Sequence, residues 1–365
     1  LSETAWQARK RIGLATSYGC PLRCLFCVNE SMIGELAWKK SEQWNWDVDF
    51  SWKGKHVYHY HSPEYIIKEI KTAENLLWNV EPRGPIDYLD FADENFLTTH
   101  DISPNHDRIF QLRDAWLAAD FQPQCVKDRI VHDPNTCAGK HITATSHAGR
   151  VRPELLEAMR DMGVSVLDYG LESFNLENMR NMQKGSMPHL NIRAVRMTMS
   201  YGIRPCPNQI LGFPTESFKS IRDNVAAWKE LGVIVYPFMV TCFPGSAYFL
   251  LNRKRIEEQY GGDLELFIMD LGDCTKPTAS ICDFTVEEMT KLRDWMVKGE
   301  RESVDKYENV WRKRHDLAPL TPEQQGEEWK AAELRAADPR GKWPPQEEPV
   351  PLQVPYKPEH VKIRG

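Results

Sequence analysis

The sequence predicts an α/β fold: a partial barrel of six strand–helix units, a (β/α)6 arrangement, followed by a helical C-terminal extension. Apolar runs typical of strands alternate along the chain with segments typical of helices, and this alternation implies parallel strands joined by right-handed crossovers. Six units fall short of the eight that close a barrel, so we expect an open sheet. The expected strands lie at 11–18, 86–91, 141–146, 164–173, 203–211 and 233–240.

Helices are expected between these strands for local reasons. Ser62-Pro63-Glu64 places a capping residue and a proline where a helix can begin, and Gly163 suits a helix end. Gly185 and Pro188 interrupt the longest helical region. The expected helices begin near 63 and span 105–119, 153–162, 174–201 and 218–231, with a further stretch at 285–314.

Composition narrows the class of protein. The chain has 365 residues, a hydrophobic content of 41% and a charged content of 27%, which are ordinary for a globular protein. No apolar run approaches the ~20 residues that span a membrane, and no secretory signal is visible. Nine scattered cysteines indicate a reducing compartment, which predicts a cytoplasmic protein. The net charge of −6 argues against a large nucleic-acid footprint.

Three cysteines in eight residues form the most specific motif of the chain. Cys20, Cys24 and Cys27 follow the first expected strand with the spacing C-x3-C-x2-C, and Phe26 precedes the third. Three thiolates on one loop suit a 4Fe–4S cluster with one iron left open for a small molecule. The alternatives are a zinc site or incidental buried cysteines. Zinc sites usually add a second ligand pair or histidines further on, and no such pair follows here.

Polar residues and glycines also gather where the other expected strands end. In parallel α/β folds, ligands bind at this edge of the sheet. Taken alone, a polar residue after a strand is more often a helix cap or a solvated end. The prediction of a ligand site therefore rests on the common position of these residues. These residues are Asp93-Glu94-Asn95, Glu172, Gly212-Phe213-Pro214 and Pro244-Gly245.

The motifs together resemble the radical S-adenosylmethionine (SAM) superfamily over residues 11–246, and within it the class that often carries a cobalamin-binding domain. The motifs that carry the resemblance are the cysteine loop, Phe91-Ala92-Asp93-Glu94-Asn95-Phe96, Gly170-Leu171-Glu172-Ser173, Met182-Gln183-Lys184-Gly185, Leu211-Gly212-Phe213-Pro214-Thr215-Glu216 and Pro244-Gly245-Ser246. The resemblance implies that the open iron takes the amino and carboxylate groups of SAM. One electron then cleaves the sulfonium, and the resulting 5′-deoxyadenosyl radical takes a hydrogen from a substrate.

The resemblance also implies roles for carboxylates at two strand ends. Ala92, Asp93 and Glu94 would meet the methionyl ammonium, for which a carboxylate or a backbone carbonyl is the sensible partner. Glu172 would bind the ribose hydroxyls or the ammonium. Because it ends an apolar strand, we expect it to serve SAM binding and not folding.

The remaining implied contacts surround the same ligand. Lys184 would pair with the SAM carboxylate, although a solvated helix lysine is an equally good reading of its sequence context. Phe26 and the ends of the fifth and sixth strands, at Gly212 and Pro244, would flank the adenine.

The chain is expected to divide into a core at 1–246, a helical region at 247–316 and a Pro- and charge-rich tail at 317–365. The tail is expected to be weakly structured or wrapped on the surface. Within the core, a Trp-rich insertion at 31–61 is either a wall of the substrate pocket or a packed loop.

Cobalamin-dependent relatives usually carry a D-x-H-x-x-G pattern in an N-terminal domain, and no such pattern occurs here. Either that domain precedes Leu1 or the protein works without it. An auxiliary cluster is not expected, since the later cysteines lack tight pairs. The later cysteines are Cys206, Cys242, Cys274 and Cys282.

The favoured function is that of a radical SAM enzyme that functionalises a C–H bond, with methyl transfer as the first choice. The alternatives are a radical oxidative cyclase or rearrangement enzyme, and a non-catalytic iron–sulfur protein. A tRNA methylthiotransferase would add an N-terminal cysteine triad and a basic C-terminal domain, and neither appears. The expected partners are a small-molecule or peptide substrate, a flavodoxin or ferredoxin as electron donor, and a cobalamin-binding domain or subunit.

Overall fold

A computed structural model describes residues 11–20, 22, 24–28, 59–80, 86, 88–97, 107–128, 139–272 and 274–337 of the chain. Its centre is a six-stranded parallel sheet with the strand order β1-β4-β5-β6-β7-β8, and β2 and β3 pair separately as an antiparallel ribbon. The order follows the chain, so the sheet is an open α/β half-barrel as predicted. The strands of the sheet are β1 (Arg11–Leu14), β4 (Tyr88–Phe91), β5 (His141–Ser146), β6 (Val164–Glu172), β7 (Arg204–Leu211) and β8 (Phe238–Met239).

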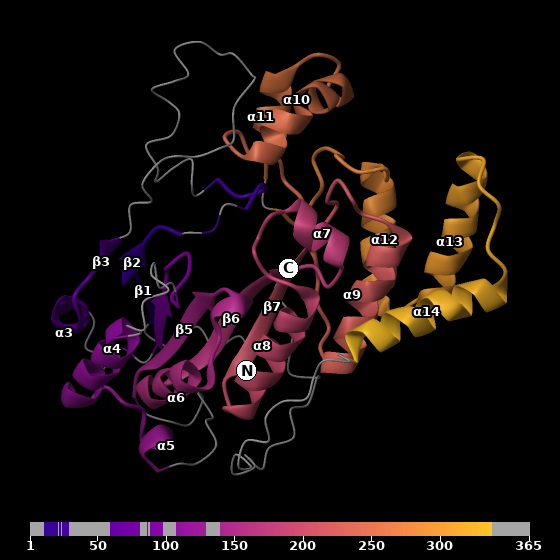
Figure 1. The fold of residues 1–365 in the computed structure, drawn as a ribbon. Helices are drawn as coiled ribbons and strands as arrows, with labels where there is room; N and C mark the ends of the chain where they lie inside the picture. The colour runs from indigo at the N-terminus through magenta and orange to yellow at the C-terminus, as the bar shows by residue number, and fades with distance from the viewer. Residues whose placement is uncertain are drawn as a thin grey trace.

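Helices pack on one side of this sheet and extend beyond its last strand (Figure 1). Their ends follow local rules: Gly163 ends α6 with a φ of 92°, and Ser217 caps α9. The helices up to the last strand are α3 (Pro63–Val80), α4 (Asp107–Ala118), α5 (Gln124–Lys127), α6 (Pro153–Met162), α7 (Leu176–Asn181), α8 (Pro188–Ser200) and α9 (Phe218–Leu231). The helices after it are α10 (Ala247–Gln259), α11 (Leu264–Asp270), α12 (Val286–Lys298), α13 (Arg301–Arg314) and α14 (Pro322–Ala336).

The two faces of the sheet differ in chemistry. Residues on the helix-covered face, such as Leu89, Ile142 and Leu167, are fully buried in the main core. The residues between them on the same strands include Asp90, Thr143 and Asp168, and these keep partial exposure. Because side chains alternate along a strand, one face forms the core and the opposite face, here called the inner face, stays partly open and polar.

Two strand predictions need correction. The expected strand 11–18 divides into β1 and β2 (Ser17–Tyr18), because Thr16 leaves the sheet to bond with Asp93. The expected strand 233–240 shrinks to Phe238–Met239. Pro237 has no N–H for a ladder, and Val233 instead donates its N–H to Trp228 at the end of α9.

The C-terminal region is helical, as predicted. The tail from 317 onward is expected from the sequence to be weakly structured or wrapped on the surface, and the first alternative is wrong for residues 322–336. Residues 322–336 form α14, which packs along α9 (Figure 1) and buries Trp329, Ala332 and Ala336. Arg335 donates two hydrogen bonds to Asp223 of α9, at 2.8 and 2.6 Å. The apolar residues are sparse, yet their 3–4 residue spacing places them on one helix face.

Most of the predicted Trp-rich insertion, 31–58, lies outside the described residues, so its role as a pocket wall stays a prediction. Its last residues are described: β3 (His59–Tyr60) pairs with β2. Within the described part of the chain, no helix combines the length and apolar character that a bilayer crossing demands.

Candidate active site

The cysteine loop is held in place by the backbone of one residue. Leu25 donates its N–H to the carbonyl of Met182 at 3.1 Å and accepts from the N–H of Tyr248 at 2.9 Å. A turn closes between Cys24 and Cys27, with an N–H···O distance of 3.0 Å. The loop is therefore fixed between the end of α7 and the start of α10, at the carboxyl edge of the sheet.

The three thiols on this loop fit an iron–sulfur cluster. Cys20, Cys24 and Cys27 are reduced thiols and partly exposed, and they lie near enough that the charge of Cys27 acts on the other two. Burial raises the pKa of Cys24 to about 12, so bound iron would be needed to hold its thiolate at neutral pH. No described His, Cys, Asp or Glu residues gather as tightly as a single metal ion requires. In a multi-iron cluster each thiolate binds a separate iron, so its cysteine sulfurs lie further apart than the ligands of one zinc ion.

Glu172 and Lys184, predicted from separate motifs, meet beside this loop. Their side chains form an ion pair, and both are buried. The charge of Lys184 acts on Cys20 and Cys24, and that of Glu172 acts on Cys24. Lys184 is thus not a solvated helix lysine. Burial lowers its pKa, but the nearby charges of Glu172 and Cys24 outweigh this and raise it overall.

A backbone irregularity aims Glu172 at its partner. The β6–β7 register shifts between Gly170 and Glu172, and Glu172 has a φ of 62°, in the left-handed region that non-glycine residues rarely adopt. Asn191 of α8 secures this bulge by donating to the carbonyls of Leu171 and Ser173, at 2.9 and 3.0 Å. Backbone strain of this kind tends to occur at functional sites.

Gly170 makes room for the ion pair. A Cβ added at Gly170 would lie 2.5 Å from both Glu172 Oε1 and Lys184 Nζ. The glycine in the Gly170-Leu171-Glu172-Ser173 motif therefore leaves the space that the ends of these two side chains occupy.

His147 positions Lys184, and sequence reasoning missed it. His147 Nδ1 accepts from the N–H of Gly149 at 3.1 Å, so the proton is on Nε2, which donates to the Lys184 carbonyl at 3.2 Å. Burial, followed by the charges of Lys184 and Arg150, lowers the pKa of His147 to about 3 and keeps the ring neutral. The signal was available, since His147 directly follows the third strand.

The residues after β4 hold the first strand in place. Asp93 is buried and accepts hydrogen bonds from the N–H and the hydroxyl of Thr16, at 3.3 and 2.9 Å, and from the Ser17 hydroxyl. Glu94 accepts from the N–H of Gly19 at 3.1 Å and its charge reaches Cys20. Ala92 is exposed. Glu94 is thus nearest the cysteine loop, and contact of Ala92, Asp93 and Glu94 with SAM stays a prediction.

Hydrogen bonds within the loop after β7, and from Asn178 of α7, hold this loop as a turn. Glu216 is buried and accepts from the N–H of Gly212 at 2.8 Å and from Asn178 at 3.0 Å, and Asn178 also accepts from the Thr215 hydroxyl at 2.7 Å. Gly212 is needed because an added Cβ would lie 2.7 Å from Met289 Sδ. Glu216 was named in a motif, but its role in holding this turn emerges only from the structure.

Aromatic rings connect this turn to the cysteine loop. The Phe26 ring lies 6.2 Å from that of Phe213, edge to face, and 5.8 Å from Lys184 Nζ. Pro244 is exposed at the start of the segment that leads into α10. An adenine site formed by Phe26, Gly212 and Pro244 stays a prediction.

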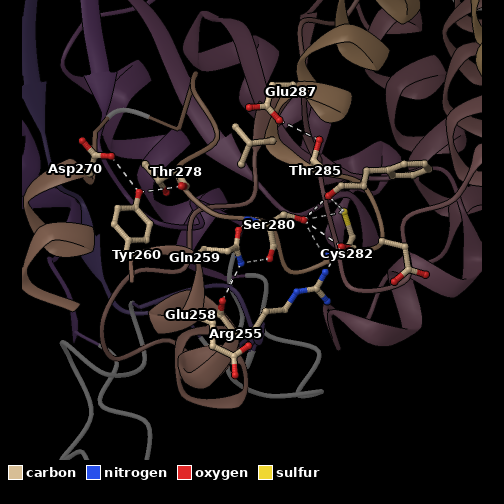
Figure 2. Close-up of a pocket in the computed structure, with 13 residues that line it drawn as sticks. Arg255, Glu258, Gln259, Tyr260, Asp270, Thr278, Ser280, Cys282, Thr285 and Glu287 are labelled. Carbon is tan, nitrogen blue, oxygen red and sulfur yellow. Dashed lines mark hydrogen bonds between the residues drawn. The ribbon is translucent and has the colours of Figure 1, made fainter. Parts of the chain in front are cut away.

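A separate pocket opens between the end of α10 and the segment before α12 (Figure 2). Several of its polar groups pair with one another: Tyr260 donates to Asp270 and to the Thr278 carbonyl, and Gln259 bonds with Ser280 in both directions. None of the predicted site residues lines it. The chemistry is expected at the cysteine loop and not here.

The chain is similar to a known protein family and to a protein from another organism. Residues 14–227 match the family model described as the radical SAM superfamily. An uncharacterized methyltransferase from Pyrococcus horikoshii, PH0819, is 22% identical over 280 residues, which cover 76% of this chain and 48% of that protein. The chain thus spans about half the length of this relative.

Two cobalamin-dependent enzymes of known structure show distant similarity. The radical enzyme OxsB, solved with aqua-cobalamin and SAM, is 15% identical with a TM-score of 0.44, covering 84% of this chain and 36% of that one. The methyltransferase TsrM from Kitasatospora setae, solved with cobalamin and a 4Fe–4S cluster, is 14% identical with a TM-score of 0.45, covering 68% and 40%.

Proposed function

Because this chain belongs to the radical SAM superfamily, we propose that it is an enzyme that holds a 4Fe–4S cluster on Cys20, Cys24 and Cys27, binds SAM beside it and transfers a methyl group to a substrate carbon. The observation that carries this proposal is the meeting of the cysteine loop with the buried Glu172–Lys184 pair. When bound and reduced by an external flavodoxin or ferredoxin, the cluster supplies the electron that cleaves SAM.

The residues of the chain itself would bind and orient the ligand. Lys184 offers an ammonium that suits the SAM carboxylate, and Glu172 offers an acceptor for the ribose hydroxyls or the methionyl ammonium. Neither side chain needs to travel far, since Asn191 holds the bulge at Glu172 and His147 holds the backbone at Lys184. Phe26 supplies an apolar face beside them.

The relative from Pyrococcus horikoshii supports methyl transfer over the other radical reactions, because it is named a methyltransferase. Its alignment covers 76% of this chain. A role for cobalamin is part of the proposal, since TsrM is a methyltransferase solved with cobalamin bound. Expression with cobalamin in the medium, followed by absorption spectroscopy of the purified protein, tests this part separately.

The cluster is tested by metal content. After anaerobic reconstitution we expect about four iron and four sulfide per chain. The triple variant Cys20→Ala/Cys24→Ala/Cys27→Ala should lose nearly all of both, while Cys274→Ala, a matched change at a partly exposed cysteine, should retain them. Equal iron in the triple variant and the wild type would contradict the assignment.

The reaction is tested by its products. The reduced, reconstituted protein is expected to release 5′-deoxyadenosine or S-adenosylhomocysteine from SAM, and the triple variant should release neither. SAM labelled in its methyl group should pass the label to a substrate. Release of 5′-deoxyadenosine without label transfer would favour a cyclase or rearrangement enzyme, and no turnover at full cluster content would favour an electron-transfer protein.

A further inference from the structure

The inner face of the sheet is polar at positions that parallel barrels usually fill with Val, Ile and Leu. On β4 to β7, the residues that face away from the helices include Asp90, Thr143, Asp168 and Cys206, and all four keep partial exposure. The helix-covered face of the same strands is fully buried. Tyr88, His141 and Val166 of the same face are buried, but the face is polar and partly open at these four positions, which suits a polar ligand better than a packed core.

The strand registers place these polar residues in two adjacent rows. Gly13, Asp90 and Thr143 face one another across β1, β4 and β5, and Thr145, Asp168 and Cys206 do so across β5, β6 and β7. The charge of Asp90 acts on Asp168, so the two carboxylates are electrostatic neighbours.

Both carboxylates have unused capacity to accept hydrogen bonds. Asp90 pairs with Arg11 through Oδ2, but its buried Oδ1 has no hydrogen-bond partner among the described residues. Asp168 takes its side-chain hydrogen bond from the Cys206 thiol, a weak donor, and its nearest cations, Arg204 and Arg11, form no ion pair with it in the described part of the chain. The two carboxylates lie two strands and two residues apart on this face, near enough for their charges to interact, and such a pair without full pairing favours a cationic donor beside it.

There is also room beside these carboxylates. A Cβ added to Gly13, which pairs in register with Asp90, would meet no atom of the described residues within 4 Å. Glu172 lies four residues beyond Asp168 on β6, so Asp168 is about 13 Å from the proposed SAM site along the strand, and Asp90, in register with Val166, lies two residues deeper.

We propose that Asp168 and Asp90 bind a primary ammonium group of the substrate and thereby hold its reactive carbon toward the cysteine loop. This inference rests on the proposed function for the direction in which the substrate lies. The binding step itself depends only on the two carboxylates and the space at Gly13. Charge-assisted hydrogen bonds from one ammonium would satisfy Asp90 Oδ1 and replace the weak thiol donor at Asp168.

Three probes of one length test the inference: 5-aminopentan-1-ol, 1,5-pentanediol and 5-hydroxypentanoate, titrated calorimetrically into the reconstituted protein. We expect saturable binding of the amine alone. Asp168→Asn should weaken it at least 10-fold, which is about 1.4 kcal/mol. Gly13→Val keeps both carboxylates but fills the space beside them, and it should also weaken amine binding. Asp294→Asn, at an exposed position of α12, should leave amine binding unchanged.

The inference would be overturned if the protein bound no amine, bound the diol equally well or preferred the carboxylate. It would also be overturned if folded Asp168→Asn and Gly13→Val proteins bound the amine as tightly as the wild type. Preference for the carboxylate would assign recognition to Arg11 and Arg204 instead. The same preparation is assayed for SAM cleavage. Amine binding without cleavage overturns the proposed function alone, and cleavage without amine binding overturns this inference alone.

Discussion

Glu172 and Lys184 form an ion pair at the end of β6 in which each side chain is only 8% exposed. Taking two charges out of water is costly, and their attraction repays this only when the geometry is good. The same pair therefore contributes both to the stability of the fold and to the proposed SAM site.

Replacing Glu172 with Gln leaves the Lys184 ammonium buried without its carboxylate. We expect the free energy of unfolding in urea to fall by about 3–5 kcal/mol. Adding Lys184→Met should restore most of this loss, because it removes the stranded charge. The sequence alone predicted a purely ligand-binding role for Glu172, and the buried pair is the reason to expect a stability effect as well.

The control for this pair is Glu177→Gln, an exposed carboxylate in the first turn of α7, which should change stability by less than about 0.5 kcal/mol. If Glu172→Gln behaved like this control, the pair would contribute nothing to folding.

Gly170→Ala should displace the pair without unfolding the sheet. The added Cβ conflicts with the ends of two side chains and not with backbone, so those ends move. We expect a several-fold weaker affinity for SAM, measured by equilibrium dialysis on the reconstituted protein. Gly326→Ala, where an added Cβ meets nothing within 4 Å, should leave SAM affinity unchanged. Unaltered SAM affinity in Gly170→Ala would mean that the position of the pair does not matter for the ligand.

His147 should make stability depend on pH. Its folded pKa of about 3 lies below the ordinary 6.5, so below pH 6.5 the unfolded chain takes up a proton that the folded protein does not. Its contribution is therefore complete above pH 6.5 and is lost as the pH falls toward 3, with a slope of at most about 1.4 kcal/mol per pH unit.

Urea unfolding of the wild type and of His147→Gln at pH 7 and pH 5 isolates this effect. Glutamine does not titrate, so the variant should lose less stability between the two pH values than the wild type. Equal losses in both proteins would show that His147 is not buried in its neutral form.

Trp329 should anchor α14. Its indole is buried, lies 4.4 Å from the Arg301 guanidinium and donates to Asp305. Trp329→Ala should lower the free energy of unfolding by about 3–5 kcal/mol, whereas Leu334→Ala, at a residue that is 63% exposed, should be nearly neutral. Similar small effects for both would indicate that α14 is not docked in solution.

The sequence by itself determined whatever depends on neighbours in the chain. The spacing of Cys20, Cys24 and Cys27, the strand 141–146 and the helix 153–162 with its glycine end could be predicted, because thiol spacing, side-chain period and capping act within a few residues. The common edge of the sheet followed from the alternation of strands and helices.

Only the tertiary structure decided what depends on residues far apart in the chain. It turned Asp93 toward Thr16, brought Lys184 to Glu172 through a bulge, and docked α14 on α9. It also revealed the polar inner face, since only the register of the parallel strands puts Asp90 and Asp168 on the same face, beside Thr143 and Thr145 of β5. The physical reason is that burial and electrostatic pairing depend on distance in space, which local sequence patterns do not specify.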